Sequence, residues 1–169
     1  MSGPLIGIVG SAGAYGRWLQ HFFQERMGLE VIGHDPADPA SADETELVQR
    51  ADVLVFSAPI RRTGALIARY AELAAGSEAG RLWLDVTSIK AAPVAAMLAS
   101  RAEVVGLHPM TAPPKTPTLK GRVMVVCEAR LDTWRPWLAQ LLDALQAECG
   151  EHRLQHQHAR PAVGAQPFG

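Results

Sequence analysis

Apolar and polar positions follow two different periods along this chain, and the two periods alternate from the first residues to about residue 148. Short, nearly continuous apolar runs predict β-strands that are covered on both faces. Longer stretches with apolar residues three and four apart predict amphipathic helices. The strands are predicted at 4–9, 29–34, 52–57, 81–86, 103–107 and 122–127, and the helices at 13–27, 43–50, 62–75, 90–100 and 131–148.

This succession of strands and helices predicts the fold class. Strands that alternate with helices form mostly parallel sheets, with helices packed on both faces. We therefore expect an α/β, doubly wound, Rossmann-like domain over residues 1–150. Ligands of such folds bind beyond the carboxyl ends of the strands, where the strand order reverses.

The first strand ends in a glycine-rich segment that opens the first helix, in the pattern G-x-x-G-x-x-G. Glycine lets backbone N–H groups approach an anion, and a helix N-terminus favours negative charge. The segment therefore suits the pyrophosphate of a dinucleotide, although an ordinary strand-to-helix turn can also be rich in glycine. The predicted cofactor contacts here are Gly10, Ser11, Ala12, Gly13, Ala14, Tyr15 and Gly16.

The second predicted strand ends in a candidate ligand for the ribose. Asp35 lies 22 residues after Gly13, and an acidic residue about 20 residues past the glycines binds the ribose hydroxyls in dinucleotide-binding folds. A carboxylate there repels a 2′-phosphate, so Asp35 favours NAD over NADP. His34 and Arg61 or Arg62 leave room for a phosphate, and an Asp-Pro pair is also a common start of a turn.

Three further strand ends should reach the same crevice. Ser57 and Pro59 follow the third strand and are predicted to contact the cofactor. His108 is the predicted proton acceptor, because an imidazole titrates near neutral pH. Ser88 would orient that imidazole or hold a substrate hydroxyl. The structural alternatives are a helix cap for Ser88 and a strand-end residue for His108.

These residues carry a resemblance to a known family. Together with the glycine segment, Asp85–Lys90 (DVTSIK) and Gly106–Met110 (GLHPM) resemble the prephenate/arogenate dehydrogenases of tyrosine biosynthesis, over about residues 5–150. The resemblance implies that a nicotinamide cofactor accepts hydride from prephenate, carbon dioxide leaves and 4-hydroxyphenylpyruvate forms. It also implies that His108 is the catalytic base and that Ser88 contacts the substrate.

The chain departs from the family in two places. The family usually continues H-P-M with F-G-P, where this chain has Thr111-Ala112-Pro113. In the family, a second, all-helical domain forms the dimer and supplies an arginine for the substrate. Residues 151–169 of this chain do not match that domain. We expect these residues to be a polar, poorly ordered or truncated tail. The alternatives are therefore an arogenate-specific enzyme and a catalytically silent dinucleotide-binding module.

Composition narrows the range of partners. The net charge is −1 and 48% of the residues are hydrophobic, with no basic stripe for nucleic acid and no apolar run long enough for a bilayer. The two cysteines are far apart, and the start does not resemble a signal peptide, so we expect a cytoplasmic protein with free thiols. The expected partners are a small-molecule substrate, prephenate or arogenate, and a second copy in a homodimer. The histidines at 152, 156 and 158 have no acidic or cysteine partner in the sequence, so we expect a solvated tail there rather than a metal site.

Overall fold

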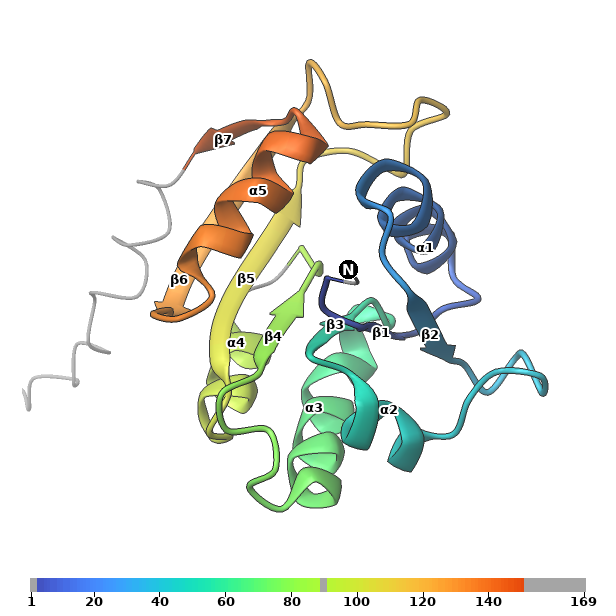
Figure 1. Cartoon of the computed structure of the whole chain (residues 1–169), viewed down its shortest axis with the longest axis vertical. Helices are drawn as coiled ribbons and strands as arrows, with labels where there is room; N and C mark the ends of the chain where they lie inside the picture. Colours follow the sequence, from blue (N-terminus) through green and yellow to red (C-terminus); the bar gives the residue numbers. More distant parts are fainter. Residues whose placement is uncertain (1–2, 89–90, 151–169) are drawn as a thin grey trace, which may run out of the picture.

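A seven-stranded sheet runs through the middle of the computed structural model, which describes residues 3–88 and 91–150 (Figure 1). The strand order is β2-β1-β3-β4-β5-β6-β7. The strands are β1 (Ile6–Val9), β2 (Val31–His34), β3 (Val53–Phe56), β4 (Leu82–Asp85), β5 (Glu103–Pro109), β6 (Val123–Arg130) and β7 (Glu148–Gly150). The helices are α1 (Ala14–Met27), α2 (Glu44–Arg50), α3 (Ile60–Ala74), α4 (Ala91–Leu98) and α5 (Arg135–Leu145).

The first five strands are parallel, and their carboxyl ends lie at one edge of the sheet. Val9 pairs with both His34 and Phe56, and the register continues from Phe56 to Asp85 and from Asp85 to Gly106. The strand order reverses at β1, which lies between β2 and β3. β6 is antiparallel to β5, and β7 is parallel to β6. The predicted doubly wound, mostly parallel fold is confirmed.

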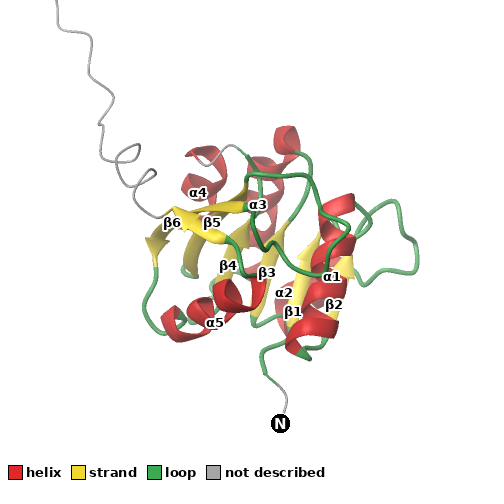
Figure 2. Ribbon diagram, turned by 90° about the horizontal axis from the view of Figure 1, so that it is seen from above, coloured by secondary structure: helices red, strands yellow, loops and turns green. Residues whose placement is uncertain are grey.

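Helices cover both faces of the sheet (Figure 2). α1 and α5 pack on one face, over buried side chains that include Ile6 and Val55, and α2, α3 and α4 pack on the other, over Val9 and Leu54. Successive side chains of a strand point to opposite faces. Each central strand must therefore be apolar throughout, which explains the continuous apolar runs in the sequence.

The sequence placed the last helix wrongly at both of its ends. The predicted helix 131–148 begins at Arg135 and ends at Leu145, and β7 follows it. Gln146 adopts a left-handed φ of 59°, and its N–H bonds to the Leu142 and Asp143 carbonyls, which closes the helix. β7 is too short for a period of two to show in the sequence. β5 also extends two residues further than predicted, so His108 lies within the strand.

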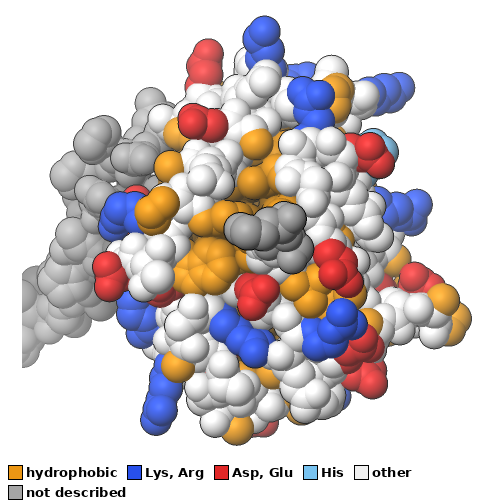
Figure 3. All heavy atoms as spheres, viewed as in Figure 1, with side chains coloured by type: hydrophobic (Ala, Val, Ile, Leu, Met, Phe, Trp, Pro, Cys, Tyr) orange, Lys and Arg blue, Asp and Glu red, His pale blue; other side chains and the backbone are white. Residues whose placement is uncertain are grey.

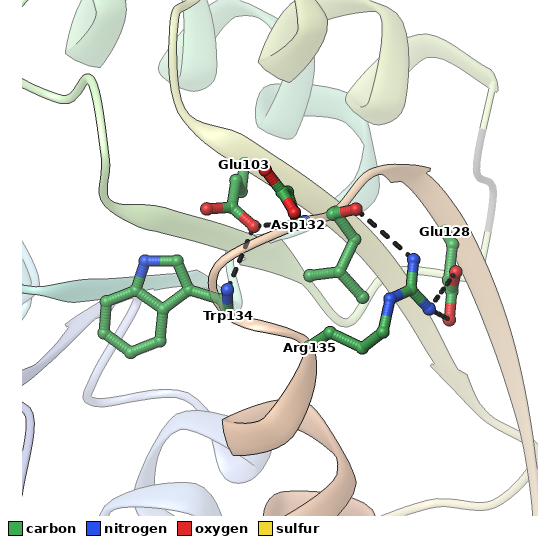
Figure 4. Close-up of polar contacts among 6 residues, drawn as sticks. Glu103, Glu128, Asp132, Trp134 and Arg135 are labelled. Carbon is green, nitrogen blue, oxygen red and sulfur yellow. Dashed lines mark hydrogen bonds and ion pairs between the residues drawn. The ribbon is translucent and has the colours of Figure 1, made fainter.

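A buried carboxylate fixes the turn that starts α5 (Figure 4). Glu103, at the start of β5, accepts hydrogen bonds from the backbone N–H groups of Asp132 and Trp134 through Oε1. Nearby, the guanidinium of Arg135 pairs with the carboxylate of Glu128, on β6, at 3.0 Å. Glu103 therefore ties α5 to the sheet at the edge opposite the carboxyl ends of the parallel strands.

The face of the molecule shown in Figure 3 carries both charged and apolar side chains. In the view of Figure 3, acidic and basic side chains are interspersed around the rim, and apolar side chains gather near the middle. Among the helices of the described residues, none is both long and apolar enough to cross a membrane. The predicted tail, with its three histidines, lies outside the described residues, and so do Ile89 and Lys90.

Candidate functional site

Two of the three glycines in the segment Gly10–Gly16 are required by the fold itself. Gly10 has a φ of 90°, and a Cβ there would lie 2.7 Å from the Ser57 carbonyl oxygen. A Cβ on Gly16 would lie 2.1 Å from the Gly10 carbonyl oxygen. The loop therefore packs directly against the end of β3 on one side and against α1 on the other, which no larger residue allows.

Gly13 differs, because nothing in the fold requires glycine there. It is exposed at the N-cap of α1 with extended dihedral angles, and a Cβ would meet only the Gly10 carbonyl oxygen, at 3.4 Å. The first turn of α1 holds no acidic residue. A bare backbone and the positive end of a 14-residue helix face open space here, an arrangement suited to an anion.

Asp35 joins the end of β2 to the same loop. Its Oδ2 accepts a hydrogen bond from the Ala12 N–H at 3.0 Å, and its Oδ1 accepts one from the Ala37 N–H at 2.9 Å. Both carboxylate oxygens are thereby held in place while keeping lone pairs for another donor. The sequence predicted Asp35 as a ligand but could not show that it also orders the glycine loop.

One cleft runs along the carboxyl ends of the strands, in two sections that share Gly13 and Ser57–Pro59. The outer section, of about 580 Å³, is lined by Asp35 and the glycine loop together with Glu44 and α3. The inner section, of about 510 Å³, contains Ser88 and His108. The site residues predicted from separate strands thus lie along one continuous surface.

The end of β4 is shaped by a fully buried carboxylate. Asp85 accepts hydrogen bonds from the Thr87 hydroxyl at 2.5 Å and from the Thr87 N–H at 3.3 Å. This turn carries the exposed Ser88 into the inner section of the cleft, where the half-buried His108 arrives on β5. Asp85 therefore positions the segment, and Ser88 is available to a ligand.

α1 also holds the proline-rich loop that follows β5. The Tyr15 hydroxyl donates to the Thr111 carbonyl, and the Trp18 indole N–H donates to the Thr116 carbonyl at 3.1 Å. Burial raises the pKa of Tyr15 to about 12, although Arg122 partly offsets the effect. The phenol is thus a neutral donor at physiological pH, and it joins the cofactor side of the cleft to the loop beside His108.

The structure brings most of the predicted site residues together. Those that line the cleft are Gly10, Ala12, Gly13, Ala14, Tyr15, Asp35, Ser57, Pro59, Ser88 and His108. Ser11 and Gly16 line neither section: Ser11 packs against Gly33, and Gly16 packs against the loop backbone.

Several lining residues were missed by the sequence analysis. They include Glu44, Leu66, Arg69, Thr87 and Thr111. On α3, Arg62, Leu66 and Arg69 follow a spacing of four and three, which places them on one helix face. That spacing was the available signal, but it indicates a shared face without showing that the face meets a cleft.

These features define a class of protein: a Rossmann-like domain whose glycine loop, helix N-terminus and acidic strand end are arranged for a nucleotide. A family model described as "Prephenate dehydrogenase, nucleotide-binding domain" matches residues 35–153. The chain belongs to this family, and the predicted resemblance is confirmed.

Two curated proteins are similar to the chain over most of its length. The T-protein of Enterobacter agglomerans is 30% identical over 153 residues, which cover 89% of this chain and 38% of that protein. A probable arogenate/prephenate dehydrogenase of Methanocaldococcus jannaschii is 25% identical over 157 residues, covering 85% and 34%. The chain thus spans little more than a third of the length of these relatives.

Solved structures of dehydrogenases and reductases share the fold. Prephenate dehydrogenase from A. aeolicus, in complex with hydroxyphenyl propionate and NAD+, aligns with a TM-score of 0.70 at 15% identity, covering 89% of this chain and 60% of that one. Pyrroline carboxylate reductase of Plasmodium falciparum with NADP bound aligns at 0.67 with 13% identity, covering 89% and 58%. At these sequence identities the similarity to the solved structures establishes the fold alone.

Proposed function

We propose that residues 1–150 form the NAD-binding domain of a prephenate dehydrogenase-like oxidoreductase of tyrosine biosynthesis. The observation that carries the proposal is the single cleft that joins Asp35 and Gly13 to Ser88 and His108. Membership of the family supports the assignment. So does the A. aeolicus relative in fold, whose structure contains both NAD+ and an aromatic acid.

The residues of the cleft fit a nicotinamide dinucleotide. The bare backbone at Gly13 leaves space for a pyrophosphate at the N-terminus of α1, where a side chain would intrude. The carboxylate of Asp35 can accept hydrogen bonds from the ribose hydroxyls, and it favours NAD because a 2′-phosphate would meet its negative charge. When bound, the cofactor supplies a hydride acceptor.

His108 is the residue proposed to move a proton. It would take the proton of the ring hydroxyl of prephenate, which places electron density on that oxygen and helps hydride to leave the same carbon. The ring carboxylate then leaves as carbon dioxide, its bonding electrons complete the aromatic ring, and the oxygen regains a proton. Ser88, in the same section of the cleft, would hold the substrate or orient the imidazole.

Reduction of NAD by the 169-residue chain in the presence of prephenate tests this proposal. We expect turnover in the wild type and a loss of at least about 100-fold in kcat for His108→Asn, because general base catalysis contributes about that much or more. His21→Asn is the matched control: His21 is exposed on α1 and does not line the cleft.

Two other outcomes would point to the alternatives. A faster reaction with arogenate than with prephenate would assign the chain to arogenate. Binding of NAD without turnover of either substrate would contradict the proposed oxidoreductase activity and favour a silent dinucleotide-binding module.

A further inference from the structure

An ion pair lies in the outer section of the cleft, and it is separate from the residues proposed to bind pyrophosphate and ribose. Oε2 of Glu44, on α2, lies 3.0 Å from Nε of Arg69, on α3, and both residues line the section that contains Asp35. We propose that Glu44 and Arg69 recognise the amino edge of the adenine base, so that the cleft selects an adenine dinucleotide over its hypoxanthine counterpart. This inference rests on the proposed dinucleotide-binding function.

The position of the ion pair fits the far side of the base. With the ribose at Asp35, the attached base would extend into the part of the section that Pro36 and α3 line. On that face Arg62, Leu66 and Arg69 succeed one another over about 10 Å, at 1.5 Å per residue. Leu66 offers an apolar surface to the flat ring, and Arg69 lies furthest from the start of the helix.

The hydrogen-bonding capacity of the Glu44 carboxylate is not fully satisfied by the described residues. Oε2 is buried beside Arg69 and has no hydrogen-bond partner among the described residues, whereas the Glu44 side chain as a whole is 20% exposed. Tyr70 does not serve it: the buried phenol has no hydrogen-bond partner among the described residues. The carboxylate therefore keeps acceptor capacity for a donor in the cleft that Glu44 lines, and a half-buried carboxylate gains free energy from such a donor.

Adenine matches this arrangement, and hypoxanthine does not. Adenine carries an amino donor beside the ring nitrogen acceptor N1, and the ion pair offers a carboxylate acceptor beside guanidinium donors. Hypoxanthine has a carbonyl oxygen in place of the amino group and a donor at N1. Its carbonyl would face the Glu44 carboxylate, so two acceptors would meet with no proton between them.

Calorimetric dissociation constants for NAD and for nicotinamide hypoxanthine dinucleotide test the inference on the full chain. We expect the wild type to bind NAD at least about tenfold more tightly than the hypoxanthine dinucleotide, because one hydrogen bond to a charged group contributes about that much to binding. Glu44→Gln should bring the two constants within about threefold, because a carboxamide can turn its NH2 toward the carbonyl. Glu46→Gln is the matched control, since Glu46 pairs with Arg50 at 2.8 Å and does not line the cleft.

The outcomes separate this inference from the proposed function. Equal binding of the two dinucleotides by the wild type would overturn the role of Glu44 and leave the dinucleotide-binding function intact. Loss of the preference in Glu46→Gln as well would overturn it too, since the effect would then not be specific to the carboxylate that lines the cleft. Failure of the wild type to bind either dinucleotide would overturn the proposed function and this inference with it. The wild-type ratio decides the question even if Glu44→Gln does not fold.

Discussion

At the scale of single residues, Gly13 and Gly16 have different roles despite the regular spacing of the glycines in the segment Gly10–Gly16. We predict that Gly16→Ala lowers the free energy of unfolding by about 1–3 kcal/mol, because the new methyl group overlaps the Gly10 carbonyl. Gly13→Ala should change it by less than about 0.5 kcal/mol, since the same methyl group meets no close neighbour. Urea unfolding of the two variants provides the comparison, and equal losses would show that the loop packs differently.

Asp35 provides the second test at this scale. Asp35→Ala should weaken the binding of NAD by about 1–3 kcal/mol, because ribose hydroxyls and the Ala12 N–H lose their acceptor. Asp38→Ala is the control: its carboxylate caps the Ala40 N–H in the same loop but does not line the cleft. Calorimetry with both variants is the measurement. An unchanged affinity in Asp35→Ala would remove Asp35 from the site.

The two tyrosines give a prediction about pH. Burial raises the pKa of Tyr15 to about 12, and burial together with the charge of Glu44 raises the pKa of Tyr70 further. In the unfolded chain both phenols titrate near the ordinary value of 10.0. The unfolded state therefore loses its protons first, and the free energy of unfolding should fall as the pH rises from about 10 toward 12.

Ultraviolet absorbance of the phenolates checks this. The folded protein should show almost no phenolate at pH 10, and Tyr15→Phe should make the decline in stability shallower. Half-ionised tyrosine in the folded protein at that pH would contradict the burial of both rings.

At the scale of elements, Figure 4 contrasts a buried carboxylate with a surface ion pair. Glu103→Ala should lower the free energy of unfolding by about 1–3 kcal/mol, because two backbone N–H groups at the start of α5 lose their acceptor. Glu128→Ala should cost at most about 1 kcal/mol, since its partner Arg135 is 57% exposed. Urea unfolding measures both. A larger loss for Glu128 would mean that the ion pair, rather than Glu103, fixes α5 to the sheet.

The sequence predicted the buried, continuously apolar strands well, and it predicted short strands and helix ends poorly. β3 and β4 are buried on both faces, so their apolar runs were unmistakable. β7 has three residues, and its place is decided by pairing with β6 across a long separation in sequence. The end of α5 depends on the left-handed backbone of Gln146, and glutamine carries no special preference for that conformation.

At the scale of the whole molecule, the topology explains why the candidate site could be assembled from scattered residues. A parallel register places the ends of β1, β3, β4 and β5 at one edge, so motifs at strand ends predict neighbours in space. Residues that reach the cleft from helices and loops, such as Glu44, Arg69 and Thr111, carry no such signal. Their position depends on how the helices pack on the sheet, and the hydrophobic periodicity of the sequence does not determine that packing.

The most direct test of the central claim is calorimetric titration of NAD into the 169-residue wild type and into Gly13→Ala. The account predicts saturable binding to the wild type and at least about tenfold weaker binding to the variant, because the added methyl group enters the path of the pyrophosphate without disturbing the fold. Equal binding by the two proteins, or no binding by a folded wild type, would contradict the assignment of this cleft to a dinucleotide.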